Sequence, residues 1–233
     1  MILIRWKQKK RKMKTILSYS GGKDSTALLI RLHELNQAPD EVHFADTGLE
    51  FPEIYEYLNK IEEYTGQTIK RIKPKKSWDE LFYTKITRGD YEGEIRGFPY
   101  VITPCWAQRD LKVRPMEKIQ KKNAIILLGI TFDEQHRIQK QENLRYPLIE
   151  WGWTEKKCKQ YLREKNLLNP IYAKFKRTGC WLCPKQPKRN LYTLEREYPD
   201  LWERLKKYEE DCPHGFKPNM SLKDYENQQK LKK

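Results

Sequence analysis

The chain has 233 residues, of which 38% are hydrophobic, 12% aromatic and 34% charged, and its mean hydropathy is −0.93. It is polar for a globular protein but too aromatic for a disordered one, and no apolar run approaches the roughly 18 residues of a membrane-spanning helix. These values exclude a mostly disordered chain and argue against a membrane partner. Because no signal-peptide core is present, we expect a cytoplasmic protein.

Basic residues outnumber acidic ones. Lysine and arginine number 47 against 32 aspartates and glutamates, which gives a formal net charge of +15. Such a charge attracts polyanions, among them nucleic acids and nucleotides, and a lysine-rich solvated surface is the alternative explanation. Five cysteines in a chain without an export signal favour metal binding or catalysis over disulfide bonds.

The first half of the chain alternates strand and helix patterns. Residues 1–14 are strongly basic and are expected to be a solvated tail, with Met13 as an alternative start of translation. Beyond them we expect strands at 15–19, 42–45, 68–72 and 124–130, a helix from about Ser25, and a helix from Pro52 to about Thr65. This alternation predicts an α/β fold with a doubly wound parallel sheet over residues 15–150, whose ligands lie at the carboxyl ends of the strands.

The pattern changes in two places. Between residues 73 and 104 the alternation fails, and so long a glycine-containing loop is typical of a lid or a binding segment. Residues 151–217 are expected to form a small C-terminal subdomain, with a helix over 154–165 and a helical stretch over 191–208. Residues 218–233 are expected to be a polar, frayed tail.

One loop has the residue types of an anion site. Ser20-Gly21-Gly22-Lys23-Asp24-Ser25 lies between the first expected strand and the first expected helix. Glycines let backbone amides turn toward one point, and a helix N-terminus, two hydroxyls and an ammonium complete the cradle. A glycine turn with an ordinary N-cap is the alternative. Six such residues between a strand and a helix favour the binding of a phosphate or pyrophosphate.

The cysteines suggest a metal centre. Cys180 and Cys183 form a CxxC turn that can aim two sulfurs at one ion. Cys105 and Cys212 would supply the third and fourth ligands, with His214 as a substitute for the fourth. Thiolates suit zinc or an iron–sulfur cluster, a redox dithiol stays open, and the residue types do not decide. The residues expected to have packing roles are Cys158, His33, His43, Trp151, Trp153, Trp181 and Trp202.

The loop Ser20–Ser25 resembles the PP-loop, with signature SGGxDS, of the ATP pyrophosphatases in the adenine nucleotide alpha-hydrolase superfamily. Three further stretches are similar to its phosphoadenylyl-sulfate (PAPS) reductase-like branch. They are Ala45 to Pro52, similar to TGxEFPE; Cys105 with Lys112, Val113 and Pro115, similar to C…KxxP; and Gly129-Ile130 with Asp133, Glu134 and Arg137, similar to GIRxDE. The resemblance covers Thr15 to about Pro184 and implies a HUP-type α/β fold.

The resemblance also implies roles for individual residues, with ATP and Mg²⁺ as cofactors. The residues implied to bind the nucleotide are Ser20, Gly21, Gly22, Lys23, Asp24 and Ser25 for the β- and γ-phosphates, and Asp46, Thr47 and Gly129 for adenosine. Asp46 is placed to bind the ribose, and Gly129 would let a flat base approach the backbone. Lys23 and Asp24 would be catalytic, and the residues that would contact phosphate or substrate are Arg109, Lys112 and Arg137.

An intact loop implies a particular reaction. In this family, sulfonucleotide reductases usually carry a degraded loop, whereas enzymes that split ATP into AMP and pyrophosphate keep SGGxDS, as this chain does. The resemblance therefore implies adenylation of a substrate for sulfur transfer to a nucleic acid, tRNA or DNA, with a sulfur-donor protein such as a cysteine desulfurase as partner. Relatives with a [4Fe-4S] cluster favour that group over zinc for Cys105, Cys180, Cys183 and Cys212.

Two other functions stay open. One is a PAPS or adenylyl-sulfate reductase that releases sulfite, in which Cys212, in a segment faintly similar to the reductases' ECGLH tail, would be the catalytic nucleophile. The other is an ATP-dependent nucleic-acid-binding module without turnover. Release of pyrophosphate separates the adenylating enzyme from the binding module, and release of sulfite identifies the reductase.

Overall fold

The computed structural model describes residues 13–120 and 124–230, and the chain divides into two compact units. The first unit extends to Phe44 and also contains Glu56–Ile72 and Met116–Asn169. The second contains Ala45–Tyr55, Lys73–Pro115 and the chain from Pro170 on. Each unit is assembled from stretches that are separate in sequence. The division into continuous ranges that we expected from the sequence stays a prediction.

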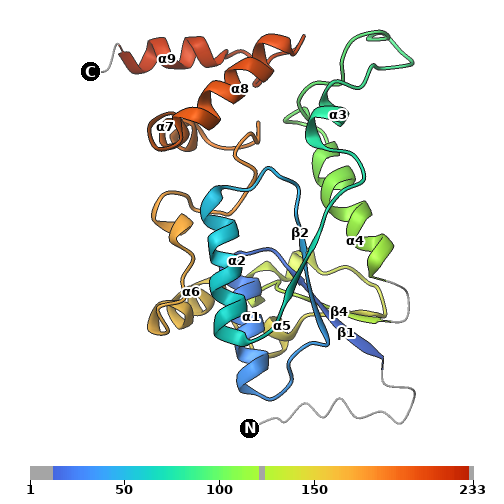
Figure 1. Ribbon diagram of the computed structural model, residues 1–233, viewed down its shortest axis with the longest axis vertical. Helices are drawn as coiled ribbons and strands as arrows, with labels where there is room; N and C mark the ends of the chain where they lie inside the picture. The colour runs from blue at the N-terminus through green and yellow to red at the C-terminus, as the bar shows by residue number, and fades with distance from the viewer. Residues whose placement is uncertain (1–12, 121–123, 231–233) are drawn as a thin grey trace. The chain divides into compact units, whose positions relative to one another are not determined.

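A five-stranded sheet forms the centre of the first unit, in the order β3-β2-β1-β4-β5. Figure 1 labels β1, β2 and β4 among its strands. The strands are β1 (Lys14–Tyr19), β2 (Glu41–Ala45), β3 (Ile69–Ile72), β4 (Ala124–Leu128) and β5 (Leu144–Arg145). β1 runs parallel to β2 and to β4, and β4 runs parallel to β5. The expected α/β fold with a parallel sheet is confirmed. The strand order changes direction between β1 and β4, where doubly wound sheets bind ligands.

Aliphatic side chains hold the middle of this sheet together. Leu17 of β1 lies beside Val42 of β2 and Leu127 of β4. All three side chains are buried, which is typical of parallel strands that are covered on both faces. Ile16, also on β1, packs with Ile126 in the same core.

The flanking helices begin where the sequence signals them. These helices are α1 (Lys23–Glu34), α2 (Pro52–Thr65), α5 (Pro147–Glu150) and α6 (Glu155–Glu164). α2 starts with proline, whose fixed φ suits the first helical position. Thr154 caps α6 by accepting a hydrogen bond from the Lys157 amide at 3.2 Å, and α6 packs against α1. A 3₁₀ segment, η2 (Phe132–Arg137), follows β4.

The second unit is mostly helical. Its elements are α3 (Trp78–Phe82), the π-helix η1 (Gln108–Val113), the 3₁₀ segment η3 (Pro170–Ala173), α7 (Lys188–Glu197), α8 (Pro199–Asp211) and α9 (Leu222–Lys230), and α4 (Arg114–Ile119) continues from η1. Trp78, Phe82, Phe98 and Tyr208 form an aromatic core, with ring centroids 5.0 to 6.4 Å apart. The segment 73–104 is therefore packed through its aromatic residues, although the sequence showed no regular element there.

The structure corrects two expectations about the C-terminal part. The helical stretch expected over 191–208 is two helices, because Pro199 disfavours helical backbone at Tyr198, which takes φ −140° and ψ 62°. The tail from residue 218 is not frayed throughout, because α9 forms within it. Leu222 and Tyr225 of α9 are buried, and Ser221 caps the helix by accepting a hydrogen bond from the Asp224 amide at 3.0 Å.

Two further expectations concern the ends of the chain and membranes. The basic tail predicted over 1–14 lies outside the described residues except for Met13 and Lys14, and Lys14 is the first residue of β1. Across residues 13–120 and 124–230, the helices are all too short or too polar to cross a membrane.

Candidate functional site: a phosphate-binding loop and a thiol cluster

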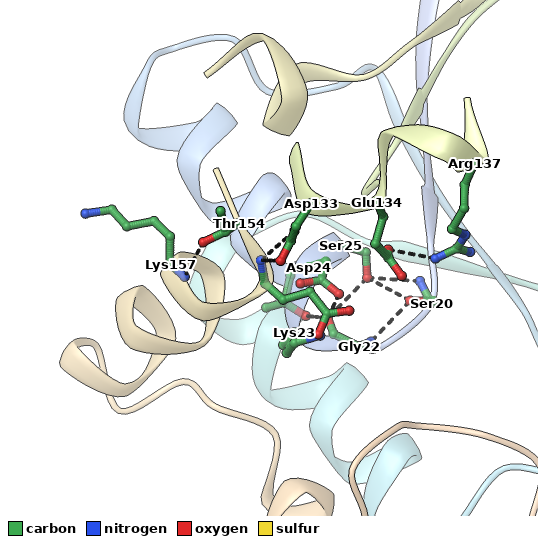
Figure 2. Close-up of polar contacts among 12 residues, drawn as sticks. Ser20, Gly22, Lys23, Asp24, Ser25, Asp133, Glu134, Arg137, Thr154 and Lys157 are labelled. Carbon is green, nitrogen blue, oxygen red and sulfur yellow. Dashed lines mark hydrogen bonds and ion pairs between the residues drawn. The ribbon is translucent and has the colours of Figure 1, made fainter. Parts of the chain in front are cut away.

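The predicted phosphate-binding loop lies between β1 and α1, as its sequence context indicates (Figure 2). Gly21 takes φ +70°, a conformation that other residues rarely adopt. Gly22 is the N-cap of α1 and has no side chain that could accept a hydrogen bond from the first-turn amides, a position where helices commonly bind anions. The positive end of the helix dipole adds to their attraction for an anion.

Hydrogen bonds within the protein fix the shape of this loop. The hydroxyl oxygens of Ser20 and Ser25 are 3.0 Å apart, and the Ser20 amide donates to Ser25 Oγ at 3.2 Å. The amide nitrogen of the Gly22 backbone lies 3.3 Å from Ser20 Oγ. Asn169, buried and far along the chain, donates its Nδ2 to the Gly21 carbonyl at 2.9 Å. The loop is therefore preorganised, and Asn169 is a supporting residue that no local sequence signal identifies.

Lys23 and three carboxylates set the charge of the loop. Lys23 is only 9% exposed, and its Nζ lies 2.9 Å from Asp24 Oδ2 and 3.2 Å from Glu155 Oε2. Burial raises the pKa of Asp24, Lys23 opposes this, and Glu155 and Glu134 raise the pKa further. The loop thus brings an ammonium together with carboxylates that repel one another, an arrangement that suits phosphate bound with a divalent cation.

The segment after β4 contributes to the same site. Figure 2 shows Asp133 and Glu134 of η2 beside the loop, with Arg137 on the outer side of Glu134. Asp133 accepts a hydrogen bond from the Glu155 amide at 3.1 Å, which helps to hold the start of α6. Arg137 pairs with Glu134 at 2.7 Å and is half exposed. The predicted contact of Arg137 with substrate stays a prediction.

Gly129, directly after β4, is needed for a reason that differs from the expected one. A Cβ atom at this position would lie 2.9 Å from both the Cα and the N atoms of Ser25. The group that approaches Gly129 is therefore the first turn of α1, whereas we expected a flat base. Its role in binding adenosine stays a prediction.

In the second unit, Glu50 organises the residues that follow β2. Its buried carboxylate accepts hydrogen bonds from the Thr47 amide at 3.1 Å, from Thr47 Oγ1 at 2.9 Å and from Lys112 Nζ at 3.1 Å. Tyr55 donates its hydroxyl to Asp46 at 2.9 Å and to Glu50 at 3.3 Å. Glu50 stands in the segment similar to TGxEFPE, but we expected no role for it from the sequence.

Three of the four predicted metal ligands influence one another's pKa, although no three His, Cys, Asp or Glu side chains of the described residues are already arranged to hold a metal ion. Burial raises the pKa of Cys180 to about 11, and the neighbouring Cys183 and Cys105 contribute to this rise. Burial also raises the pKa of Cys183, to which Cys105 adds. Lys112 belongs to the same group: burial lowers its pKa, but Cys180 and Glu50 outweigh this and raise it. We refer to Cys105, Cys180 and Cys183 as the thiol cluster.

The fourth cysteine, Cys212, has a different partner. Its Sγ lies 3.6 Å from Nε2 of His214, whose ring stacks on Tyr100 with centroids 4.4 Å apart. Burial alone would raise the pKa of Cys212, but the hydrogen bond from His214 lowers it below the ordinary thiol value. Gly97 makes room for the pair, because a Cβ there would lie 2.5 Å from Sγ. The structure thus gives Cys212 an imidazole partner, and its place among metal ligands stays a prediction.

Arg109, a predicted substrate contact, is held by Asp110. The Arg109 Nε atom lies 2.9 Å from Asp110 Oδ1, and Arg96 and Arg114 bind the same carboxylate. Arg109 lowers the pKa of Asp110 to about 2, burial opposes this, and Arg96 lowers it further. Three arginines around one aspartate leave a local excess of positive charge, and the contact of Arg109 with substrate stays a prediction.

Comparisons with known proteins identify relatives of this chain. Residues 14–186 match the profile of the phosphoadenosine phosphosulfate reductase domain family. The uncharacterized protein MJ0066 of Methanocaldococcus jannaschii is 30% identical over 215 residues, which are 83% of this chain and 41% of that protein. The uncharacterized protein MJ0973 of the same organism is 26% identical over 223 residues, 85% of this chain and 50% of that protein. The chain spans half or less of these relatives.

Two solved structures are also similar in part. Phosphoadenylyl-sulfate reductase from Candida auris, in a phosphate complex, aligns with a TM-score of 0.49 and 18% identity over 71% of this chain and 81% of that chain. The U34-tRNA thiolase NcsA from Methanococcus maripaludis, with its [4Fe-4S] cluster, aligns with a TM-score of 0.44 and 15% identity over 86% of this chain and 72% of that chain.

Substitution of Gly129 by alanine tests the close approach to α1. The added Cβ has no room beside the Ser25 backbone, so we expect Gly129→Ala to lower the free energy of unfolding by about 1–3 kcal/mol. Gly179→Ala is the matched control, because nothing lies within 4 Å of a Cβ at that position. Urea denaturation followed by circular dichroism measures both. Equal stability of the two variants would contradict the close approach.

The pH dependence of cysteine alkylation tests the Cys212–His214 pair. Because His214 lowers the pKa of Cys212, its thiolate forms at lower pH than that of Cys180, whose pKa is about 11. Iodoacetamide labelling of metal-free protein, read by mass spectrometry, should therefore rise at lower pH for Cys212. His214→Ala should move only the Cys212 midpoint to higher pH. An unmoved Cys212 midpoint in His214→Ala contradicts the pairing.

Proposed function

Because this chain belongs to the phosphoadenosine phosphosulfate reductase domain family, we propose that it is a PP-loop ATP pyrophosphatase that adenylates a nucleic-acid acceptor for sulfur transfer. The observation that carries this proposal is the intact loop from Ser20 to Ser25. Its glycine N-cap has no side chain that could accept from the amides at the start of α1, and Lys23 lies buried beside them. The net charge of +15 supports a nucleic acid as the acceptor.

In the proposed reaction, an acceptor oxygen attacks the α-phosphorus of ATP. The bond from that phosphorus to the bridging oxygen breaks, and pyrophosphate leaves. The loop amides and Lys23 would hold the β- and γ-phosphates, for which Lys23 exchanges a carboxylate partner for phosphate oxygens. Positioning and preorganised charge supply most of the rate enhancement in such transfers. A sulfur nucleophile then displaces AMP from the activated carbon.

The residues of the loop fit Mg²⁺. The described residues include no group of three or more His, Cys, Asp or Glu side chains arranged to hold a metal ion. Mg²⁺ usually takes only one or two protein carboxylates, with phosphate oxygens and water completing its shell. Asp24, which Glu134 and Glu155 repel, would be such a ligand. A bound Mg²⁺ would neutralise charge on the leaving pyrophosphate.

We assign adenosine to the residues after the strands and a cluster to the thiols. Asp46, Thr47 and Gly129 follow β2 and β4, at the strand ends where such sheets bind ligands. The thiol cluster consists of soft sulfur donors, which suit iron or zinc, and Lys112 beside it would offset the negative charge of thiolates. A bound [4Fe-4S] cluster would supply iron that can hold hydrosulfide. A donor such as a cysteine desulfurase carries sulfur as a persulfide, so a thiol reductant would first have to release that sulfur as sulfide and form a disulfide.

One observation favours the second candidate function, a sulfonucleotide reductase. The lowered pKa of Cys212 beside His214 is what a nucleophilic thiol needs. In that reaction the thiolate attacks the sulfur of the sulfonucleotide, and the bond from that sulfur to the phosphate oxygen breaks, so that the nucleotide leaves. A thiol reductant then displaces sulfite from the cysteine and forms a disulfide. Such a substrate has no β- and γ-phosphates. A reductase therefore gives the buried Lys23 ammonium no phosphate to bind.

Loss of Lys23 tests the adenylation proposal. Lys23→Ala should reduce ATP-dependent pyrophosphate release by about 10²-fold or more, because a preorganised positive charge at the leaving group is removed. Lys157→Ala is the matched control, since the Lys157 side chain extends away from the loop in Figure 2. A coupled pyrophosphate assay measures both variants. Turnover of Lys23→Ala at the wild-type rate refutes the role given to the loop.

Metal content tests the thiol cluster. Cys180→Ser should lose bound iron or zinc, because it removes one of three neighbouring sulfurs. Cys158→Ser should keep the metal, because Cys158 is a fully buried residue of α6 in the other unit. Burial, the largest cause, raises its pKa, so that it stays a neutral thiol. Elemental analysis for iron, zinc and acid-labile sulfide after anaerobic purification distinguishes the variants. The assignment of ligands is wrong if both retain the same metal.

A further inference from the structure

The sequence on both sides of the CxxC turn is basic and contains no acidic residue. Between Pro170 and Leu194 the chain contains no aspartate or glutamate. The basic residues of this stretch are Lys174, Lys176, Arg177, Lys185, Lys188 and Arg189. Positive charge that is concentrated in one short segment produces a stronger local field than the same charge spread over a surface.

Within the part of the chain that the structure describes, five of these six side chains have no carboxylate partner, and four of the five have no hydrogen bond either. Lys174 pairs with Glu53 at 3.0 Å, and Lys185 donates to the Thr103 carbonyl at 2.7 Å. The other four basic residues of this stretch are exposed and make no ion pair with any residue that the structure describes. They are Lys176, Arg177, Lys188 and Arg189. Their charge therefore faces solvent and is available to an external anion.

Consecutive turns fix this segment next to the thiols. The Gln186 amide donates to the Cys183 carbonyl at 3.2 Å, and the Asn190 amide donates to the Pro187 carbonyl at 2.9 Å. The Gln186 side chain is buried and donates to the Trp181 carbonyl at 3.0 Å. The path from the CxxC turn into α7 is thus tightly hydrogen-bonded, and it keeps the first turn of α7 close to the thiol cluster.

Helix α7 adds an exposed aromatic ring to these charges. Its Leu191 and Leu194 are buried, which turns the opposite side of the helix to solvent. On that side Tyr192 follows Lys188 by four residues, one helical turn, and is 38% exposed. The guanidinium of Arg196, one turn further, lies 5.6 Å from the centroid of the Tyr192 ring. Cations interleaved with an exposed ring are typical of surfaces that bind single-stranded nucleic acid.

We propose that the exposed cations on either side of the CxxC turn bind the phosphate backbone of a single-stranded nucleic acid, with Tyr192 of α7 stacking on an unpaired base. This basic face consists of Lys176, Arg177, Lys188, Arg189 and Tyr192. The four cations can pair with successive phosphates of a nucleic-acid backbone. The Tyr192 ring can stack on an unpaired base, which an acidic protein does not offer. That the bound strand is the acceptor of the reaction rests on the proposed function, but the binding does not depend on ATP. The surface would bring an acceptor to the thiol cluster.

Binding of a fluorescein-labelled single-stranded RNA to the full chain, followed by anisotropy over a series of KCl concentrations, tests this proposal. The test variant replaces Lys176, Arg177, Lys188 and Arg189 by alanine. We expect about tenfold weaker binding or more, and a salt dependence shallower by about one unit for each phosphate that the variant no longer neutralises. The control variant loses the same net charge through four exposed lysines with acidic neighbours, Lys60, Lys118, Lys207 and Lys223. It should bind as the wild type does.

Substitution of Tyr192 separates nucleic acid from other polyanions. Tyr192→Ala should weaken RNA binding by about fivefold or more, whereas Tyr192→Phe keeps the ring and should retain the affinity. Equal RNA binding by the wild type and the four-residue variant overturns the proposal. The proposal is also overturned if Tyr192→Ala binds RNA as tightly as the wild type does and polyglutamate competes as well as unlabelled RNA. The face would then be a general polyanion surface. Wild-type protein that binds RNA at this face but releases no pyrophosphate would instead refute the proposed function.

Discussion

The first turn of α1 lies directly against the backbone at Gly129, and the phosphate-binding loop depends on this close approach. β1 and β4 are parallel neighbours, with Ser18 opposite Leu128, so the residues that follow them meet at one edge of the sheet. Any side chain at Gly129 would press on the Ser25 backbone. Lys23 and Ser25 belong to that turn, and the Ser20 hydroxyl is hydrogen-bonded to the Ser25 hydroxyl. A shift of the turn would therefore displace the groups proposed to bind phosphate.

Each unit holds a lysine between negative groups. In the first, Lys23 lies between Asp24 and Glu155, and in the second, Lys112 lies among Glu50 and the thiols. Partners of this kind keep a buried ammonium in place when no ligand is bound. Under the proposed function, Lys23 would exchange a carboxylate for phosphate oxygens, and Lys112 would offset the charge of metal-bound thiolates. The same pairing of charges would then serve nucleotide binding in one unit and metal binding in the other.

Local signals in the sequence predicted the parallel sheet, the helix that begins at Pro52 and the Thr154 cap of α6. The loop after β1 was also predictable, because its residues are contiguous. Interactions between distant residues were not predictable. Asn169 donates a hydrogen bond to Gly21 of the loop, 148 residues away, and Glu50 accepts one from Lys112, 62 residues further on. The break between α7 and α8 had a local signal, Pro199. The helical spacing of apolar residues on both sides of Pro199 suggested one continuous helix. Cys212 pairs with His214 through packing around Gly97, which spacing alone does not reveal.

The most direct test of the central claim is to identify the products formed from ATP by the full chain, in the presence of total transfer RNA and inorganic sulfide. Adenylation followed by displacement predicts AMP and pyrophosphate in equal amounts, because each turnover breaks the bond after the α-phosphorus once. ADP with orthophosphate would contradict the account, since the bond after the β-phosphorus would then be the one broken. Intact ATP, together with sulfite released from phosphoadenylyl sulfate, would also contradict it, in favour of a reductase.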